Sequence, residues 1–207
     1  MSIEFEVIKG FIFSLTIIMK IYLIRHSETI ESSENIILGQ LPGNLSEKGI
    51  FESKKIGKFL KEKQDIFKIE KIFSSDLKRA KDTAEIINNF LDLEIKFLKI
   101  LRERKAGIVE GKNENEINWE NYEKIFLPYR KHKGGENFLE VRKRAKGFYK
   151  NFFSEKENIL VVSHSVFILM FLSFFKKKSI KDSLKIDIKN KIICVDLGNK
   201  RIEFINL

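Results

Sequence analysis

The stretch KIYLIRHSET, residues 20–29, places a short apolar run directly before a basic and polar cluster. The apolar run predicts a strand, and the residues after it predict a loop at the strand's carboxyl end. A second stretch of this kind, ILVV at residues 159–162, predicts a fully buried strand and leads into Ser163 and His164. His26 and His164 therefore each lie two positions after the last residue of a predicted strand.

Outward from these two stretches, short apolar runs alternate with longer amphipathic ones, which is typical of an α/β sheet built from strand-helix-strand units. Strands are expected over 20–24, 71–73, 94–98, 159–162, 192–195 and 202–205. Helices are expected over 46–63, 76–91, 136–153 and 166–175. Ser46 is suited to cap the first of these helices, and the Phe-rich 166–175 helix is expected to belong to the core.

Residues 20–207 are expected to form one domain, with a polar insertion at about 111–135 over one end of the sheet. Residues 1–19 read as an N-terminal extension, either an added strand or a segment upstream of a true start at Met19. The apolar part of this extension is shorter than the roughly 18–20 residues of a membrane-spanning helix and is followed by Lys20, so no membrane association is expected.

The composition of the 207 residues, 43% hydrophobic and 33% charged, indicates a folded globular protein. The 39 Lys and Arg against 29 Asp and Glu give a formal charge of +10, which attracts anions. The basic residues form no dense block, so nucleic acid is not an expected partner. The single cysteine, Cys194, lies in an apolar run and is expected to be a buried thiol, which fits a reducing, cytoplasmic location.

Polar groups follow the predicted strands at the end where parallel sheets bind ligands. These groups are Arg25, His26, Ser27, Ser74, Ser75, Arg79, Arg102, Glu103, Ser163 and His164. Two imidazoles with two guanidiniums form a cationic pocket that suits the oxygens of a phosphate monoester. Because the chain has no Walker loop and no acidic pair at metal-binding spacing, we expect a site without metal or cofactor, in which a neutral imidazole attacks phosphorus.

The motifs from Lys20 to Leu207 resemble the histidine phosphatase, or phosphoglycerate mutase-like, superfamily. The family's R-H-G-x-T, S-S-D-L-x-R-A-x-x-T-A, L-x-E, G-x-x-E-G and G-G-E patterns appear in family order as RHSET (25–29), SSDLKRAKDTA (74–84), LRE (101–103), GIVEG (107–111) and GGE (134–136), ahead of VVSH (161–164). The resemblance implies a three-layer α/β/α sandwich with a mostly parallel central sheet.

The resemblance also implies roles for individual residues. His26 would become phosphohistidine, Arg25, Arg79 and His164 would hold the phosphoryl oxygens, and Glu103 would be the general acid and then the base. Because a general acid must stay protonated, the two arginines beside Glu103 in the sequence, Arg102 and Arg104, are expected to point away from it. Glu136 is either part of the site or only a favourable charge at a helix start.

The chain departs from the family pattern at three positions near the phosphate loop. Ser27 stands where the family has glycine, and its hydroxyl would either bind the phosphoryl group or crowd the pocket. Ser32 stands where asparagine is frequent, and Asn44 replaces a proline. None of the three removes a proposed catalytic group, but their effect on activity stays open.

Three functions fit these motifs. The first is a phosphatase for a small phosphorylated metabolite, similar to alpha-ribazole phosphatases or to broad-specificity members. The second is a mutase, disfavoured because only 30 residues separate Glu103 from Gly134, too few for a lid that excludes water. The third is an inactive module that binds phosphorylated ligands or nucleic acid. The insertion supplies candidate specificity residues, namely Trp119, Tyr122, Tyr129, Arg130, His132 and Lys133.

Overall fold

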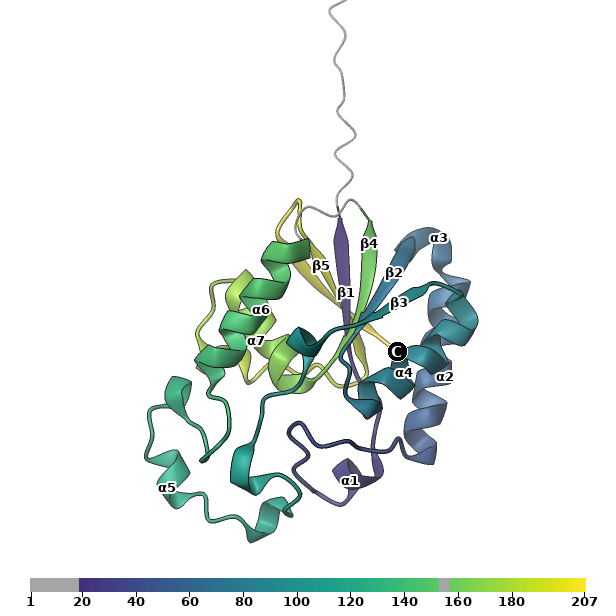
Figure 1. Cartoon of the computed structure of the whole chain (residues 1–207). Coiled ribbons are helices and arrows are strands. Elements are labelled where there is room, and N and C mark those ends of the chain that lie inside the picture. The colour runs from purple at the N-terminus through teal and green to yellow at the C-terminus, as the bar shows by residue number, and fades with distance from the viewer. Residues whose placement is uncertain (1–18, 153–156) are drawn as a thin grey trace, which may run out of the picture.

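The computed structural model describes residues 19–152 and 157–207, and its centre is a six-stranded sheet with helices on both faces (Figure 1). The strands are β1 (Lys20–Arg25), β2 (Ile69–Ser74), β3 (Glu94–Phe97), β4 (Asn158–Ser163), β5 (Lys191–Asp196) and β6 (Arg201–Asn206). Their order across the sheet is β3-β2-β4-β1-β5-β6.

The first four strands in this order are parallel, whereas β5 and β6 run antiparallel to their neighbours. In the β1–β4 pair Arg25 is aligned with Ser163, so the two segments that carry the histidines leave the sheet side by side. The antiparallel pairing of β5 with β1 brings the start of β5 to this same edge. Figure 1 shows the carboxyl ends of β1 and β4 directed toward the loops that carry α1 (Ile30–Ser33) and α5 (Glu120–Glu123).

The longer helices are α2 (Glu47–Glu62), α4 (Lys78–Leu91), α6 (Phe138–Phe152) and α7 (Ser165–Phe175). Alternate side chains of β1 enter different cores, as the period of a strand requires. Ile21 and Leu23 pack in the cluster beneath α6 and α7, and Tyr22 and Ile24 pack in the cluster beneath α2 and α4. These two cores on either face confirm the expected three-layer α/β/α sandwich.

The predicted elements are all present, with boundaries that differ by a few residues. Ser46 caps α2 by accepting a hydrogen bond from the Gly49 backbone N–H, and α7 is almost entirely buried, as expected. The sequence pattern missed α1, α3 (Gln64–Phe67) and α8 (Ile180–Ser183), because four-residue helices are too short to show a helical period.

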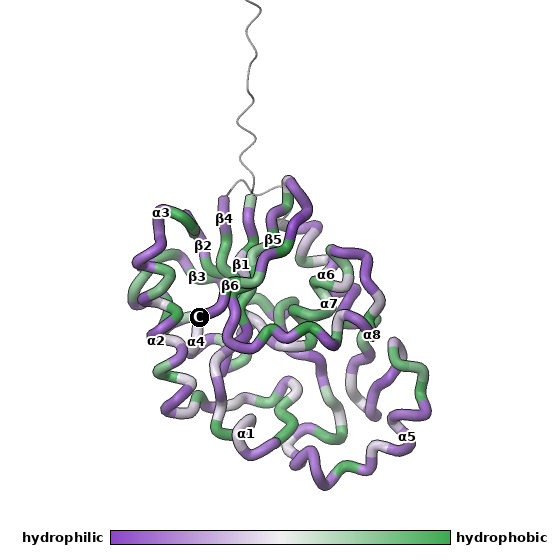
Figure 2. Tube along the Cα trace, turned by 180° about the vertical axis from the view of Figure 1, so that it is seen from behind, coloured by the Kyte–Doolittle hydropathy of each residue, from purple (hydrophilic) through white to green (hydrophobic). Residues whose placement is uncertain are grey.

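Figure 2 shows hydrophobic positions concentrated on the strands and along α7. The proposed insertion at 111–135 contains α5 and two 3-10 turns and no strand. Within 19–152 and 157–207, no helix is long and apolar enough to cross a membrane. The N-terminal extension, apart from Met19, lies outside the described residues. Met19 itself is buried in the core beneath α6 and α7, and Cys194 is buried as expected.

Candidate active site

His26 stands at the carboxyl end of β1, and its backbone N–H donates to the Ser163 carbonyl of β4 at 2.8 Å. Its ring Nδ1 lies 2.8 Å from the Ser27 carbonyl oxygen. Because a carbonyl oxygen can only accept, this contact assigns the proton to Nδ1 and makes Nε2 an acceptor. Arg79 Nε donates to that same Nε2 at 3.2 Å. The nitrogen needed for attack on phosphorus is thus unprotonated and faces a guanidinium.

Burial and positive charge keep the His26 imidazole neutral. The side chain is buried, which lowers its pKa well below the usual value of 6.5, and the guanidiniums of Arg79 and Arg25 lower the pKa further. The Ser27 carbonyl raises the pKa by a smaller amount. A neutral imidazole at pH 7 is the form that a nucleophile requires.

Arg79 is held rigidly although it is almost fully buried. From the first turn of α4 it donates through Nη1 to the Leu41 carbonyl and through Nη2 to the Gly39 carbonyl, both at 2.8 Å. The loop that offers these carbonyls is fixed in turn by Glu110, whose Oε1 accepts from the Gln40 backbone N–H at 2.9 Å. A Cβ at Gly39, where φ is +52°, would lie 2.2 Å from this carboxylate, so the close approach needs glycine.

His164 lies at the start of α7, with its ring centroid 5.0 Å from that of His26. Its Nε2 is 2.8 Å from the Ser75 hydroxyl oxygen, while its buried Nδ1 has no hydrogen-bond partner among the described residues. Burial lowers the pKa of His164 well below its usual value, and the neighbouring His26 and Arg79 lower it further. If the Ser75 hydroxyl donates to Nε2, the proton of His164 is on Nδ1 and available to a ligand oxygen.

Arg25 completes a cluster with His26, Arg79 and His164. Its Nε is buried and, like His164 Nδ1, has no hydrogen-bond partner in the described part of the chain. Buried polar atoms are nearly always hydrogen-bonded in folded proteins, so two unpaired ones beside one imidazole point to a ligand that supplies acceptors. Two guanidiniums and two neutral imidazoles match the oxygens of a phosphoryl group.

Glu103 is half-buried beside the start of α7. Its Oε1 accepts from the Arg104 backbone N–H at 2.7 Å, and its Oε2 accepts from the Val166 backbone N–H at 3.3 Å. Its own carbonyl accepts from Gln40 Nε2 at 3.0 Å. These contacts place a carboxyl group next to the first turn of the helix that begins after His164.

The guanidiniums of the two arginines next to Glu103 in the sequence are engaged elsewhere. Arg102 makes two hydrogen bonds with the Asp76 carboxylate, both at 2.6 Å. Arg104 lies over the ring of Phe138, 4.8 Å from its centroid. Neither guanidinium hydrogen-bonds with the carboxylate that would serve as general acid.

Glu136 and Arg144 form a brace behind the Glu103 loop. Arg144 Nε and Nη2 donate to the two carboxylate oxygens of Glu136 at 2.8 and 2.9 Å. The same guanidinium donates to three carbonyls of the loop, those of Ile100, Arg102 and Glu103, at 2.8, 3.0 and 3.3 Å. The structure therefore gives Glu136 a supporting position behind the Glu103 loop, through Arg144.

The family model that matches residues 21–204 is described as the histidine phosphatase superfamily, branch 1. The chain belongs to this superfamily. It is 36% identical over 139 residues to the fructose-2,6-bisphosphatase TIGAR of Xenopus tropicalis, a match that covers 61% of this chain and 47% of the relative.

Other members of the superfamily are similar over different spans. A 2,3-bisphosphoglycerate-dependent phosphoglycerate mutase of Nautilia profundicola is 41% identical over 115 residues, covering 54% of this chain and 49% of the relative. The chain thus spans about half the length of the curated relatives it matches. The solved structure of Bacillus stearothermophilus YhfR has a TM-score of 0.79 at 25% identity and covers 90% of this chain and 95% of its own.

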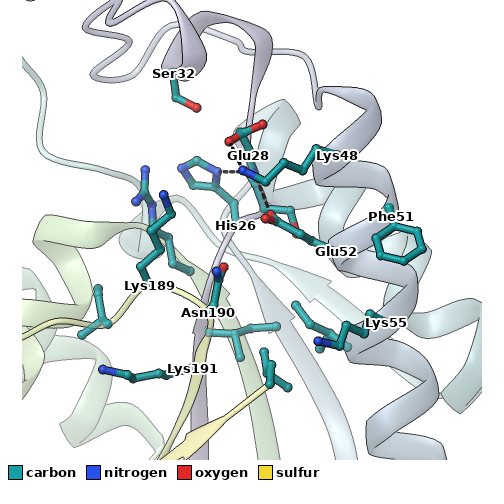
Figure 3. A pocket seen from close by; sticks show the side chains of 16 residues that line it. His26, Glu28, Ser32, Lys48, Phe51, Glu52, Lys55, Lys189, Asn190 and Lys191 are labelled. Carbon is teal, nitrogen blue, oxygen red and sulfur yellow. Dashed lines mark hydrogen bonds and ion pairs between the residues drawn. The ribbon is translucent and has the colours of Figure 1, made fainter.

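The three departures from the superfamily pattern occupy defined places. The Ser27 hydroxyl is directed at α2, where it is hydrogen-bonded to the Ser53 hydroxyl at 2.8 Å. Ser32 caps α1 by exchanging hydrogen bonds with Thr29, and its side chain lies above the His26 ring in Figure 3. The Asn44 backbone N–H donates to the Glu31 carboxylate. No hydrogen bond joins the Ser27 hydroxyl to the imidazole or guanidinium groups of the cluster, whereas the Ser27 carbonyl accepts from His26 Nδ1.

The candidate specificity residues of the insertion pack mainly against one another. The Tyr122 and His132 rings stack with centroids 4.5 Å apart, and Trp119 meets His132 edge-on at 5.7 Å. Arg130 donates to two carbonyls of its own loop, through Nε to that of Ile125 at 2.8 Å and through Nη2 to that of Glu123 at 2.7 Å. Its guanidinium is therefore committed to holding the insertion together.

Sequence reasoning gave no role to Gln40 and Arg144, which shape this site. It placed Ser75 among the polar groups at the strand ends and Glu110 in the GIVEG motif, without an individual role for either. Within the described ranges, no three His, Cys, Asp or Glu residues are grouped so that they could hold a metal ion.

Proposed function

We propose that this protein is a phosphomonoesterase that hydrolyses a small phosphorylated metabolite through a phosphohistidine at His26. The observation that carries the proposal is the Nε2 atom of His26, which is unprotonated, buried and bordered by Arg79 at 3.2 Å. The unpaired donor of Arg25 and the unpaired ring nitrogen of His164 supply further contacts for the phosphoryl oxygens.

In the first step the lone pair of His26 Nε2 attacks phosphorus, and the bond from phosphorus to the leaving oxygen breaks. Glu103, in its protonated form, gives its proton to that oxygen as it departs, so the alcohol product leaves neutral. Arg25, Arg79 and His164 hold the three equatorial oxygens while charge is redistributed over them.

In the second step the Glu103 carboxylate takes a proton from water, whose oxygen attacks phosphorus. The phosphorus–nitrogen bond breaks, its electron pair returns to Nε2, and inorganic phosphate leaves with Glu103 protonated again. The brace of Arg144 on the Glu103 loop supports this double role, because it fixes the backbone that carries the carboxyl group.

A mutase is the second candidate, supported by the similarity to the phosphoglycerate mutase of Nautilia profundicola. The phosphatase is favoured because the segment between Glu103 and Gly134 is short and most of its residues are exposed or half-exposed, which leaves the phosphoenzyme open to water. An inactive ligand-binding module is the third candidate.

For the substrate we keep the expectation from the sequence. The enzyme either acts on a substrate similar to that of alpha-ribazole phosphatases or has broad specificity. The free, buried Cys194 supports a cytoplasmic location.

The test measures phosphate release from p-nitrophenyl phosphate by wild type and by His26→Ala. We expect wild-type turnover and a loss of roughly 10⁴- to 10⁶-fold in the variant, because the attacking group is removed. Wild type mixed with substrate and quenched in alkali should carry one phosphoryl group that acid removes, as a phosphorus–nitrogen bond predicts.

A screen of phosphorylated metabolites, including alpha-ribazole phosphate, sugar bisphosphates and 3-phosphoglycerate, separates the candidates. Release of inorganic phosphate supports a phosphatase, and isomerisation of 3-phosphoglycerate without phosphate release supports a mutase. Folded wild type without any turnover or phosphoenzyme would overturn both in favour of the binding module.

A further inference from the structure

A cavity of about 540 Å³ opens beside His26, between α2 and the turn that enters β5 (Figure 3). It shares Arg25, His26 and Ser27 with the proposed catalytic centre. Arg79 and the other centre residues, Glu103 and His164, do not line it, so most of its wall is separate from the reacting groups. We call it the lysine pocket.

Positive charge dominates the walls of the lysine pocket. Five cationic side chains line it, Arg25, Lys48, Lys55, Lys189 and Lys191, against the two carboxylates of Glu28 and Glu52. Two of the cations have carboxylate partners, Lys48 with Glu28 at 2.8 Å and Lys191 with Asp187 at 2.7 Å.

The other two lysines, Lys55 and Lys189, make no ion pair with any described residue. They come from opposite walls, Lys55 from α2 and Lys189 from the turn before β5, as Figure 3 shows. The Glu28 and Asp187 carboxylates lie within electrostatic reach of Lys189 but form no direct ion pair with it. The pocket therefore offers, from two sides, lysines that are free of direct ion pairs, which suits an anionic group.

The turn that carries Lys189 is held in place. The Lys189 backbone N–H donates to Asp187 Oδ1 at 3.0 Å, and the Asp187 carboxylate also pairs with Lys191. Asn190 follows with φ at +54°, a left-handed conformation that asparagine tolerates. The backbone of this turn is thereby held beside the pocket that Lys189 and His26 both line.

An apolar surface accompanies the charge. Ile56 and Ile188 are buried and line the pocket, while Phe51 lines it with 69% of its surface exposed. A large aromatic side chain left open beside lysines favours a ligand with an apolar body and an anionic group.

We propose that the lysine pocket binds a phosphate or carboxylate group carried on a small, partly apolar molecule, next to the phosphoryl group at His26. The proposal rests on the proposed function only in taking a phosphoryl group as the occupant of the neighbouring catalytic centre. The anionic group comes either from the substrate itself, as its second charged group, or from a separate small molecule. Lys55 and Lys189 contact the anion, and Phe51 covers the apolar body.

The test titrates phenylphosphonate into ¹⁵N-labelled wild type and follows backbone amides of α2 and residues 187–191 separately from those of residues 164–166. We expect saturable shifts in the first group. Lys55→Ala and Lys189→Ala should each raise the dissociation constant fitted to those amides by about five- to tenfold, as loss of one charged contact predicts. Lys58→Ala, on the same helix but outside the pocket, is the matched control and should leave the constant unchanged.

Absence of shifts in the first group, or shifts that the two lysine variants leave unaltered, overturns the lysine pocket. Shifts at residues 164–166 report the catalytic centre independently, so this failure is distinguishable from failure of the proposed function. A kinetic arm identifies the source of the anion. If Lys189→Ala raises KM for a sugar bisphosphate but not for the monophosphate, the anion belongs to the substrate. If phenylphosphonate inhibits noncompetitively, the anion belongs to a separate molecule.

Discussion

Arg79 Nε lies 3.2 Å from His26 Nε2, so a guanidinium fixed by two backbone carbonyls borders the nitrogen proposed as nucleophile. This contact explains how α4 contributes to a site that the sequence places after β1. The guanidinium lowers the pKa of the imidazole in addition to burial, and it stands where phosphoryl oxygens would be held.

Arg79→Lys tests this relationship, because an ammonium cannot bridge two carbonyls and an imidazole at once. We expect kcat/KM to fall about 10²- to 10³-fold, as for the loss of one oxyanion donor. The unpaired carbonyls of Gly39 and Leu41 should lower the free energy of unfolding by about 1–3 kcal/mol, measured by urea denaturation. Lys78→Arg, an exchange on the same helix that keeps the pair with Asp82, is the control. Unchanged kcat/KM in Arg79→Lys would remove Arg79 from the mechanism.

Arg144 is proposed to act through Glu103, and Arg144→Met should lower kcat by about 10- to 100-fold because the carboxyl group is displaced. The loss should be larger for an alkyl phosphate than for p-nitrophenyl phosphate, since nitrophenolate leaves without a proton. Glu103→Gln should show the same dependence on leaving group with a larger loss, about 10²- to 10⁴-fold.

Two further variants separate positioning from general destabilisation. Arg144→Lys should restore part of the activity, and Lys143→Met, at the exposed neighbouring position, should change nothing. Equal losses for both leaving groups in Arg144→Met would mean that Arg144 supports the fold without directing the general acid.

The two buried histidines make stability depend on pH. Both have folded pKa values well below the 6.5 of an exposed histidine, so the unfolded chain binds more protons as the pH falls through 6.5. Their stabilising contribution is complete above this value and is lost below it. Between pH 7.5 and 5.5 each should reduce the free energy of unfolding by an amount on the order of 1 kcal/mol.

Urea denaturation at the two pH values measures this loss. In His164→Asn, the part of the pH-dependent loss of stability that comes from the two histidines should fall to about half. The half-exposed His132, whose pKa is also lowered by burial, should contribute less. A wild type equally stable at both pH values would show that the imidazoles are not held neutral.

The sequence was sufficient for the parts of the fold and site that obey local periods and strand-end rules. Apolar runs located β1 and β4, and the residues that follow them, His26 and His164, are brought to a ring distance of 5.0 Å by parallel pairing. The lysine pocket had no such signal. It depends on β5 running antiparallel beside β1, which brings Lys189 next to His26, and no local pattern reports strand direction.

The structural roles of Glu110 and Arg144 escaped sequence reasoning for a related reason. Each acts by hydrogen bonds to backbone atoms distant in the chain, at Gln40 for the first and at Ile100 for the second. A backbone carbonyl or N–H is offered by every residue type, so the partner leaves no trace in the amino-acid pattern.

We expect Ser27, which stands where the superfamily has glycine, to support the fold and to leave the chemistry unaffected. Its hydroxyl is bonded to Ser53, so Ser27→Gly should lower the free energy of unfolding by about 1–2 kcal/mol through the lost hydrogen bond and greater chain entropy. Because no transition-state contact is removed, kcat/KM should stay within about threefold of wild type. Ser53→Ala removes the same bond from α2, and a double-mutant cycle should give a coupling of about 1 kcal/mol. A large fall in kcat/KM for Ser27→Gly alone, with Ser53→Ala fully active, would instead place the Ser27 hydroxyl on the phosphoryl group.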